Sequence, residues 1–229
     1  MSHNRLVMKA SHRHSPQPPQ LPKHLPSLAI ERIVDHSELF AASIPGADFS
    51  RQTATHVSFE QVHFQHVLFL QTRLTQLRIV DARFDACDLS AADWEQARLR
   101  RVEFIGCRLL GLQLFNAQLE NVLIRQSNAE EAIFAAALGQ TAQFDRCNLR
   151  QASFEQADLT GAVFHQCDLT GADLRGAKLE RTDLRGSNID GIQIGAPELR
   201  GSILDSVQAI QVAGLLGIRV RELGEALES

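Results

Sequence analysis

The four cysteines of this 229-residue chain are the first residues whose type and spacing could support chemistry. Cys87 and Cys107 are 20 residues apart, as are Cys147 and Cys167, and 40 residues separate Cys107 from Cys147. Ser127 and Ser187 occupy the next positions of the same 20-residue series. A ladder of thiolates would suit a metal or redox site, whereas small buried thiols would serve packing alone. We favour packing, because alanine and serine take equivalent positions, and we expect free thiols in a reducing compartment.

Carboxylates and imidazoles are the other candidates for catalysis or metal binding. The aspartates recur at regular spacing, as at positions 158, 168, 173 and 183, which favours side chains that satisfy turns over an acid–base pair. Histidines lie at positions 3, 12, 14 and 24 and at positions 56, 63 and 66, without a supporting carboxylate cluster. Phosphate-binding glycine loops, zinc motifs and nucleophile elbows are absent. We therefore predict a chain that is not an enzyme and has no catalytic residue, cofactor or metal site.

A five-residue period predicts the elements that position these residues. From Leu39 to Leu204, every fifth residue is large and apolar at 31 of 34 positions, and ten of the 12 phenylalanines share this phase. Neither a helix, with a period of about 3.6, nor a strand, with a period of about 2, fits. A turn in each repeat would close a four-sided coil of about 20 residues, and coils would stack at about 4.8 Å. Residues one coil apart should then form columns, such as an interior column of Phe64, Phe84, Phe104, Phe144 and Phe164 with Ile124 in its gap.

The clearest repeats are ADLTG at 157–161, CDLTG at 167–171, ADLRG at 172–176 and TDLRG at 182–186. They resemble the pentapeptide-repeat family, whose motif is Ala, Asp or Asn, Leu and two variable residues. The resemblance extends over residues 39–204 and implies an all-β fold, a right-handed quadrilateral β-helix of about eight coils. Nine glycines lie two residues after the central position, where a corner would favour unusual backbone angles. They are Gly46, Gly106, Gly111, Gly161, Gly171, Gly176, Gly186, Gly191 and Gly201.

The segments that flank the repeats are expected to form an arm and two caps. Residues 1–26 hold five of the seven prolines and no acidic residue, which predicts a mobile, partly polyproline arm. Residues 27–38 should form a short helix or strand that caps the first coil. Residues 205–229 should contain a helix over 207–216, capped by Ser206 and stopped by Gly217, then a strand over 218–220 and a helical turn over 221–227.

The apolar residues of the C-terminal segment are expected to cap the rod or to join two rods. The main ones are Val207, Ile210, Leu215, Leu216, Ile218 and Val220. The best-studied members of the family dimerise through a C-terminal element, so the resemblance implies a homodimer formed by this segment.

Three outward-facing groups are candidate contact surfaces. The apolar patch comprises Phe115, Ile133, Ala135, Ala136 and Leu138. The basic cluster comprises Arg78, Arg98, Arg100 and Arg101, and the acidic stripe comprises Asp48, Asp88, Glu130, Glu131, Asp168 and Asp190. The patch lies on middle coils where Ala129 and Gly139 replace large core residues, which predicts a cavity, a contraction or a bend. Each group also has a plain alternative, namely repeats repacked locally or an ordinary solvated face.

Charge weighs against direct contact with nucleic acid. Lys and Arg number 23 against 27 Asp and Glu, so the net charge of −4 excludes a strongly basic binding protein. The chain also lacks the run of about 20 apolar residues that a membrane span needs. No apolar segment of a secretory signal follows the N-terminus. We therefore predict a cytoplasmic protein that contacts neither membrane nor nucleic acid.

The resemblance implies one specific function. Some members of the family bind type II topoisomerases, DNA gyrase or topoisomerase IV, and protect them from quinolones or toxins by imitating DNA. A duplex of about 40 Å carries roughly 24 negative charges. Residues 39–204, in contrast, hold 20 acidic and 16 basic residues. We therefore favour a general protein-interaction scaffold whose partner is unknown, and keep topoisomerase binding as the alternative.

Overall fold

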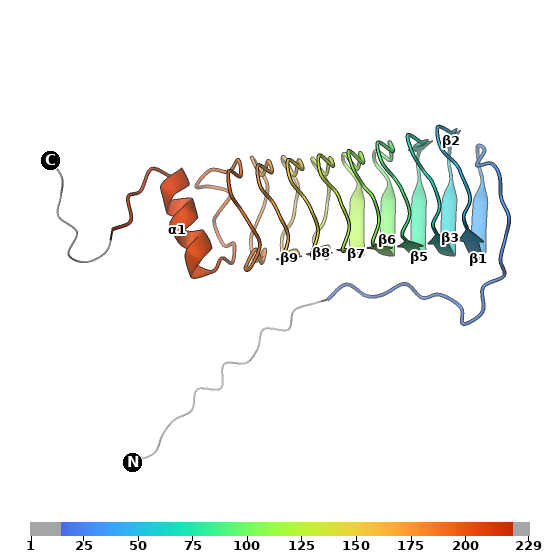
Figure 1. Ribbon diagram of the computed structural model, residues 1–229, viewed down its shortest axis with the longest axis horizontal. Coiled ribbons are helices and arrows are strands. Elements are labelled where there is room, and N and C mark those ends of the chain that lie inside the picture. The colour runs from blue at the N-terminus through green and yellow to red at the C-terminus, as the bar shows by residue number, and fades with distance from the viewer. Residues whose placement is uncertain (1–14, 222–229) are drawn as a thin grey trace, which may run out of the picture.

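The computed structural model describes residues 15–221 and shows a rod closed by one helix within that range (Figure 1). Almost all regular structure in the rod is β. The elements in chain order are β1 Glu38–Pro45, β2 Thr53–Thr55, β3 Ser58–Gln65, β4 Arg73–Thr75, β5 Arg78–Asp85, β6 Arg98–Ile105, β7 Gln118–Arg125, β8 Gln143–Asp145, β9 Val163–His165 and α1 Ser206–Leu215.

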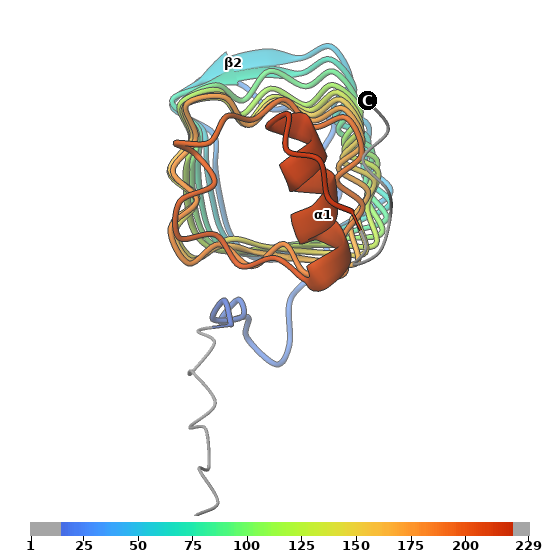
Figure 2. The same cartoon turned by 90° about the vertical axis from the view of Figure 1, so that its left-hand side faces the viewer.

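Parallel pairing with a constant step of one coil builds the rod. Seven strands form one sheet in the order β1-β3-β5-β6-β7-β8-β9, and β2 pairs with β4 in a second sheet. Ile44 pairs with Phe64 and Phe64 with Phe84, and isolated bridges carry the same step as far as Asp183 and Ile203. Seen down its axis, the coil has four sides (Figure 2). The predicted β-helix of pentapeptide repeats is therefore confirmed.

From Ala41 to Gly201 the repeats turn at the residue two positions after the central residue, with Thr141 and Ala196 as exceptions. The backbone is left-handed there, with φ of 56° at Gln61, 53° at Asp81 and 52° at Arg101. This conformation costs an L-residue about 1–2 kcal/mol but not glycine. All nine glycines predicted for corners have positive φ. Because each coil repeats the same four corners, corner residues form columns that follow the edges of the rod.

Aromatic rings stack on successive coils inside the rod. The ring centroids of Phe64 and Phe84 are 4.7 Å apart, with an angle of 20° between the rings. Phe144 and Phe164 repeat this arrangement at 4.7 Å and 4°. Ile124 pairs with Phe144 and lies in the gap of the column. The interior column predicted from the period is therefore confirmed, and its side chains are buried.

The smallest core residue of the middle coils does not leave a cavity. A Cβ built on Gly139 would stand 3.2 Å from Cδ2 of Leu159 and 3.5 Å from Cβ of Ala142. The leucine of the next coil therefore occupies the space that a larger residue at position 139 would take. Of the predicted cavity, contraction or bend, the cavity is not found at this position, because packing closes over the missing side chain.

The N-terminal cap is an irregular segment over residues 27–37. Ser27 forms a single bridge with Ser43. Ile33 is 4% exposed and closes the end of the core, while its amide donates to Oε1 of Gln52 at 2.7 Å. The predicted helix or strand does not form, because the cap takes its hydrogen bonds one at a time from the first coil.

The helix α1 lies across the other end of the rod (Figure 2). Asp205, and not the predicted Ser206, is its N-cap: the carboxylate accepts from the amides of Val207 and Gln208. The Gln208 side chain in turn accepts from the Asp205 amide at 3.0 Å, which completes a capping box. Gly217 follows the helix with φ of 76°, so the predicted stop is confirmed.

The segment after α1 differs from its prediction. Residues 218–220 form no strand, because their backbone pairs with no neighbouring strand of the coil. Instead the Ile218 amide donates back to the carbonyl of Ala213 at 2.8 Å, as a helix end requires. Of the helical turn predicted over 221–227, all but Arg221 lies outside the described residues.

The predicted mobile arm is wrong for its second half. Residues 15–26 lie along the rod, on the side of β1, β3, β5, β6 and β7 (Figure 1). The Gln20 amide donates to Oδ1 of Asp81, and the Pro26 carbonyl accepts from the Ser43 amide. These bonds hold a segment that its composition alone would leave in solvent. Residues 1–14 of the predicted arm lie outside the described part.

Candidate interaction surfaces

The cysteine ladder lies inside the rod and makes structural hydrogen bonds. Cys107 Sγ donates to the Phe84 carbonyl at 3.3 Å. Ser187 Oγ makes the equivalent bond to the Phe164 carbonyl at 3.1 Å, which explains why serine continues the series. A hydrogen bond with Cys87 and burial raise the pKa of the Cys107 thiol. A thiol in this state is a poor metal ligand and a poor nucleophile.

The regularly spaced aspartates satisfy turns. Oδ1 of Asp168 accepts from the Thr170 amide at 3.0 Å, and Oδ1 of Asp158 accepts from the Thr160 amide at 3.1 Å. This bond to the amide two residues on is the one that aspartate makes in turns, so the turn role is confirmed. Within residues 15–221, no three His, Cys, Asp or Glu side chains converge as metal ligands. No helix in the same range is long and apolar enough to cross a bilayer.

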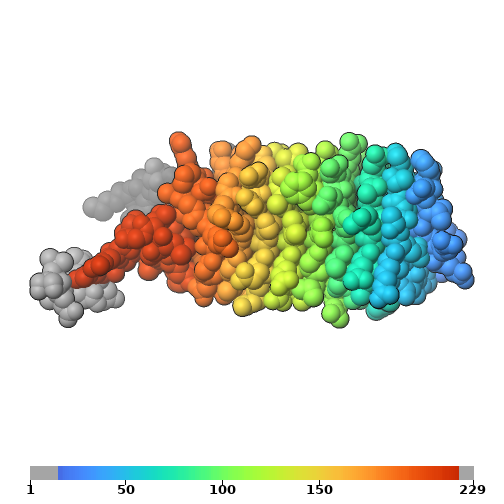
Figure 3. All heavy atoms as spheres, turned by 90° about the horizontal axis from the view of Figure 1, so that it is seen from above, coloured from blue at the N-terminus to red at the C-terminus, as the bar shows by residue number. Residues whose placement is uncertain are grey.

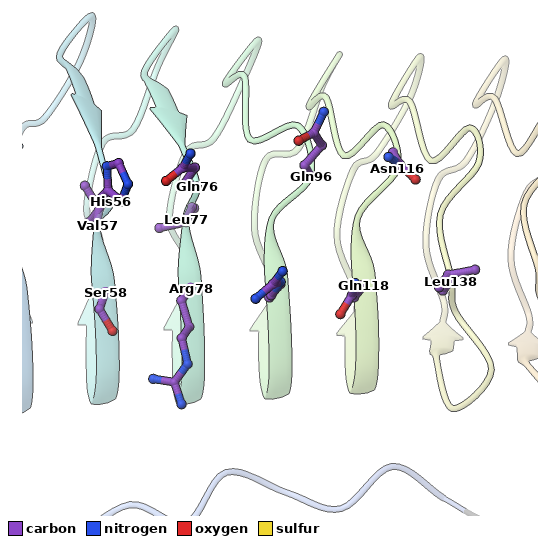
Figure 4. A pocket seen from close by; sticks show the side chains of 11 residues that line it. His56, Val57, Ser58, Gln76, Leu77, Arg78, Gln96, Asn116, Gln118 and Leu138 are labelled. Carbon is purple, nitrogen blue, oxygen red and sulfur yellow. The ribbon is translucent and has the colours of Figure 1, made fainter. Parts of the chain in front are cut away.

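A groove of about 710 Å³ follows one edge of the rod from β3 through β5, β6 and β7 to Leu138 in the next coil (Figure 4). Its apolar floor contains Val57 and Leu77, which are both buried. One corner column lines it with His56, Gln76, Gln96 and Asn116. The next column along the coil lines it with Ser58, Arg78, Arg98, Gln118 and Leu138. The groove therefore combines amide and guanidinium groups with an apolar floor and an apolar end.

The predicted apolar patch is continuous with the end of this groove. Leu138 is 50% exposed and lines the groove, and Phe115 is 42% exposed beside Asn116. The Asn116 amide donates to the Ala135 carbonyl, so Phe115 and Ala135 occupy the same column on successive coils. Ile133, Ala135 and Ala136 are half-buried. The structure thus brings the five patch residues together at one edge of the rod.

The predicted basic cluster does not form a single surface. Arg78 and Arg98 line the groove. Arg78 also donates to Glu60 at 3.4 Å. Arg101 stands on another corner, where it is paired with Asp81. The cluster therefore divides between two edges, and only Arg78 and Arg98 contribute positive charge to the groove.

The predicted acidic stripe is interrupted and largely paired. The column that runs through Asp48 and Asp88 also contains Leu68 and Arg108. The Arg108 guanidinium lies 3.7 Å from Asp88, and Arg150 lies 3.2 Å from Asp168. These contacts reduce the negative field that this face presents.

Two further members of the stripe, Glu130 and Asp190, also have hydrogen-bond partners. Asn148 donates to Glu130 at 3.3 Å, and Gln211 of α1 donates to Asp190 at 2.8 Å. Burial alone would raise the pKa of Asp168, but hydrogen bonds from Thr170 and the charge of Arg150 hold it below its usual value. Glu131 lies on the adjoining corner and is exposed. The stripe is thus a set of turn and pairing residues rather than a continuous charged ridge.

Two family descriptions match the repeats. The first, pentapeptide repeats in eight copies, matches residues 147–186, and the second, a pentapeptide repeat region, matches residues 77–150. The chain is a pentapeptide-repeat protein. No curated protein matches its sequence.

This pentapeptide-repeat protein is similar to several solved structures. HetL, a pentapeptide repeat protein involved in heterocyst differentiation regulation from the cyanobacterium Nostoc sp. strain PCC 7120, is 19% identical, with 77% of this chain and 90% of HetL covered and a TM-score of 0.43. Full-length QnrB1, a plasmid-mediated fluoroquinolone resistance protein, is 21% identical, with 85% and 99% covered and a TM-score of 0.36. Rfr23, from the cyanobacterium Cyanothece 51142, is 18% identical, with 76% and 91% covered and a TM-score of 0.15. At these identities the likeness concerns the fold alone.

The C-terminal residues of this pentapeptide-repeat protein divide between two sides of α1. Gln208 and Val212 are buried against the last coil, and Gln208 Nε2 donates to the carbonyls of Leu184 and Ser187 at 2.6 and 2.7 Å. The six predicted cap residues are 40–66% exposed: Val207, Ile210, Leu215, Leu216, Ile218 and Val220. The helix therefore caps the rod with one side and leaves apolar side chains on the other.

One column of surface residues and one buried residue were missed at the level of sequence. The groove column of His56, Gln76, Gln96 and Asn116 recurs once per coil, so the period alone places it on one edge. Gln208 has the spacing Asp-x-x-Gln of a capping box with Asp205, which marks the start of α1. Both signals are readable in the sequence once the corner position of the repeat is known.

Proposed function

We propose that this pentapeptide-repeat protein is a non-catalytic scaffold that binds a protein partner along the groove and the apolar patch. The proposal rests mainly on the continuity between the two. The groove ends at the exposed Leu138. The exposed Phe115 directly precedes Asn116, which also lines the groove. Exposed apolar residues that adjoin a groove with polar sides are typical of protein interaction sites. On the face seen in Figure 3 the described coils follow one another along the rod in chain order, so binding would use the edge and faces of the coils themselves.

The chemistry of the groove defines the partner. Arg78 and Arg98 provide guanidinium groups on successive coils, since the two residues are paired in register between β5 and β6. Gln76, Gln96 and Asn116 offer donors and acceptors at intervals of about 4.8 Å. An extended segment with acidic side chains and an apolar residue toward Leu138 would satisfy both groups. We therefore assign the groove to an extended acidic peptide segment of a partner protein.

Site-specific crosslinking tests this assignment. A photoreactive benzophenone residue placed at position 115 should crosslink one discrete partner in cells, and Arg98→Glu should abolish that adduct through charge reversal in the groove. The matched control is position 155, which lies two coils away in the same column outside the patch. Phe115→Ser with Ile133→Ser should also remove the interaction. Equal adducts from positions 115 and 155, or adducts unchanged by these substitutions, would contradict the proposal.

Protection of a type II topoisomerase is the alternative that the family resemblance implies. Imitation of DNA requires an acidic surface, and the paired acidic stripe offers little support for it. A supercoiling assay with purified DNA gyrase, with and without a quinolone, separates the two functions. We expect no change in supercoiling or drug sensitivity when this protein is added. Protection that is lost in an Asp48→Asn, Asp88→Asn and Glu131→Gln variant would favour the alternative instead.

A further inference from the structure

The N-terminal arm, residues 15–26, is held by hydrogen bonds from residues far away in the sequence. The Gln17 amide donates to Oδ1 of Asn121 at 3.1 Å, and the Gln20 amide donates to Oδ1 of Asp81 at 2.8 Å. Gln61 Nε2 donates to the Gln20 carbonyl at 3.3 Å. The arm therefore runs along the rod and crosses several coils, as the ribbon shows (Figure 1).

The rod side of this contact is one corner column. Its members, which we call the edge strip, are Gln61, Asp81, Arg101 and Asn121 together with the neighbouring Val80. Val80 has an outward position beside the corner, yet it is only 3% exposed, and Asp81 is 4% exposed. Another outward residue, Asp145, is 5% exposed because Arg125, Arg146 and His165 bond to it, so burial of this degree requires groups that lie over the residue. Over Asp81 these groups are the arm, through the Gln20 amide, and the Arg101 guanidinium.

The spacing of the two hydrogen bonds matches a polyproline II helix. Asn121 and Asp81 are two coils apart, which is about 9.6 Å at about 4.8 Å per coil. Gln17 and Gln20 are three positions apart, which is about 9.3 Å at the polyproline II rise of about 3.1 Å per residue. An α-helical arm would cover only about 4.5 Å over the same interval. The sequence SPQPPQLP is rich in proline, which favours this conformation and lowers the entropy cost of ordering it.

The pattern of prolines also selects the donors. Proline has no backbone N–H, so within residues 16–20 only Gln17 and Gln20 can donate. Both of them do, and both have the period of three that places residues on one side of a polyproline II helix. Pro16 and Pro19 precede them with the same period and are half-buried. On the strip, the acceptors Asp81 and Asn121 alternate with Arg101, which cannot accept.

We infer that the edge strip is a binding site for a proline-rich segment in the polyproline II conformation, and that the arm is its ligand within the same chain. The recognised pattern is Pro-Gln-x-Pro-Gln, with two amide donors one helical turn apart. The edge strip lies on a different corner from the groove, so this site is separate from the proposed partner surface. Release of the arm would open the strip to the same kind of segment from another molecule.

A full-length variant with a released arm tests the inference. Gln17→Pro with Gln20→Pro removes both donors while it retains the polyproline II preference of the arm. A fluorescein-labelled peptide of residues 15–26 should then bind the variant. It should bind the unaltered protein at least tenfold more weakly, because the arm already occupies the edge strip there. A tethered segment binds at a millimolar effective concentration, so the free peptide can have a weak affinity for the strip. The titration therefore extends to about 1 mM peptide. A peptide that carries the same two prolines is the control and should not bind.

Variants of the strip assign the binding to named residues. When added to the variant with the released arm, Asn121→Ala should weaken peptide binding at least fivefold. Asp173→Asn, which lies on another face of the rod, should leave peptide binding unchanged. Hydrogen exchange gives a second measurement on the unaltered protein: the amides of Gln17 and Gln20 should exchange more slowly than in the free peptide. Exchange at the rate of the free peptide, no binding to the released variant, or equal binding to both proteins would overturn the inference.

Discussion

Asp81 and Arg101 form a two-point ion pair across successive coils of the rod. Nε and Nη2 of Arg101 donate to the two carboxylate oxygens, both at 2.6 Å. The two side chains are only 6% and 15% exposed. The amide of Gln20 adds a third bond to the same carboxylate. Most surface ion pairs contribute little to stability, but this pair is shielded from water and also holds the arm.

Loss of the guanidinium should destabilise the rod strongly. We expect Arg101→Ala to lower the free energy of unfolding by about 3 kcal/mol, because it leaves a buried carboxylate without its partner. Arg101→Lys should recover only part of the loss, since lysine lacks the two-point geometry. Urea unfolding measures both effects. Arg175→Ala is the matched control: it removes a two-point pair with Asp173, but Arg175 is 60% exposed and its loss should matter much less. Equal losses at positions 101 and 175 would contradict the role of burial.

The same pair predicts how stability depends on pH. The hydrogen bonds from Arg101 hold the pKa of Asp81 below its ordinary value of 3.8. The unfolded chain therefore takes up this proton at a higher pH than the folded chain does. The stabilisation is fully present above about pH 5 and is lost as the pH falls through the lowered folded pKa. In urea unfolding at a series of pH values, Asp81→Asn should reduce the acid-dependent loss of stability. An identical slope in both proteins would show that another carboxyl group is responsible.

The cysteine ladder should tolerate serine. We expect Cys107→Ser to change the free energy of unfolding by less than about 1 kcal/mol, because a hydroxyl can make the same bond to the Phe84 carbonyl. Cys107→Leu should cost about 1–3 kcal/mol through overpacking. Thermal and urea unfolding measure these effects, and metal analysis of the untagged protein provides the control. If the purified protein contains bound metal, or if the Cys107→Ser variant fails to fold, the metal or redox interpretation of the ladder would be favoured instead.

The interior of this fold is predictable because its period determines the phase of every buried residue. Phe64 and Phe84 stack as predicted, since a fixed step of one coil leaves only one register for their strands. The corner glycines follow for the same reason, because nearly every turn has a left-handed residue at a known position of the repeat. The five residues of the apolar patch meet at one edge for the same reason. Ile133, Ala135 and Ala136 lie in one repeat, Leu138 lies in the next repeat, and Phe115 is one coil before Ala135.

The contacts outside the period are not predictable in this way. The bond between Gln17 and Asn121 joins residues that are 104 apart in the sequence, and no repeat phase relates them. The composition of the arm indicates polyproline II structure but does not indicate which surface it meets. The strand expected over 218–220 fails for a related reason, because its β-branched residues lie beyond the last coil, where no strand is available to pair with them.

The exposed side of α1 predicts end-to-end association of two rods. Val207, Ile210 and Ile218 are 66%, 57% and 57% exposed, while the opposite side of the helix is sealed against the last coil by Gln208. Burial of apolar surface by a second copy would offset this exposure. Solution scattering coupled to size-exclusion chromatography should give twice the mass of 25.4 kDa and a particle close to twice the length of one rod.

Two variants distinguish this arrangement from association through the apolar patch. Val207→Ser with Ile210→Ser should give a monomer, because both substitutions remove apolar area from the outer side of α1 without touching the buried Gln208. Phe115→Ser with Ile133→Ser should leave the dimer intact, since these residues lie far from the helix along the rod. A dimer no longer than one rod, which only the second variant disrupts, would assign self-association to the patch. A monomer of the unaltered protein would show that α1 is a simple cap, and the exposed residues would then need no partner.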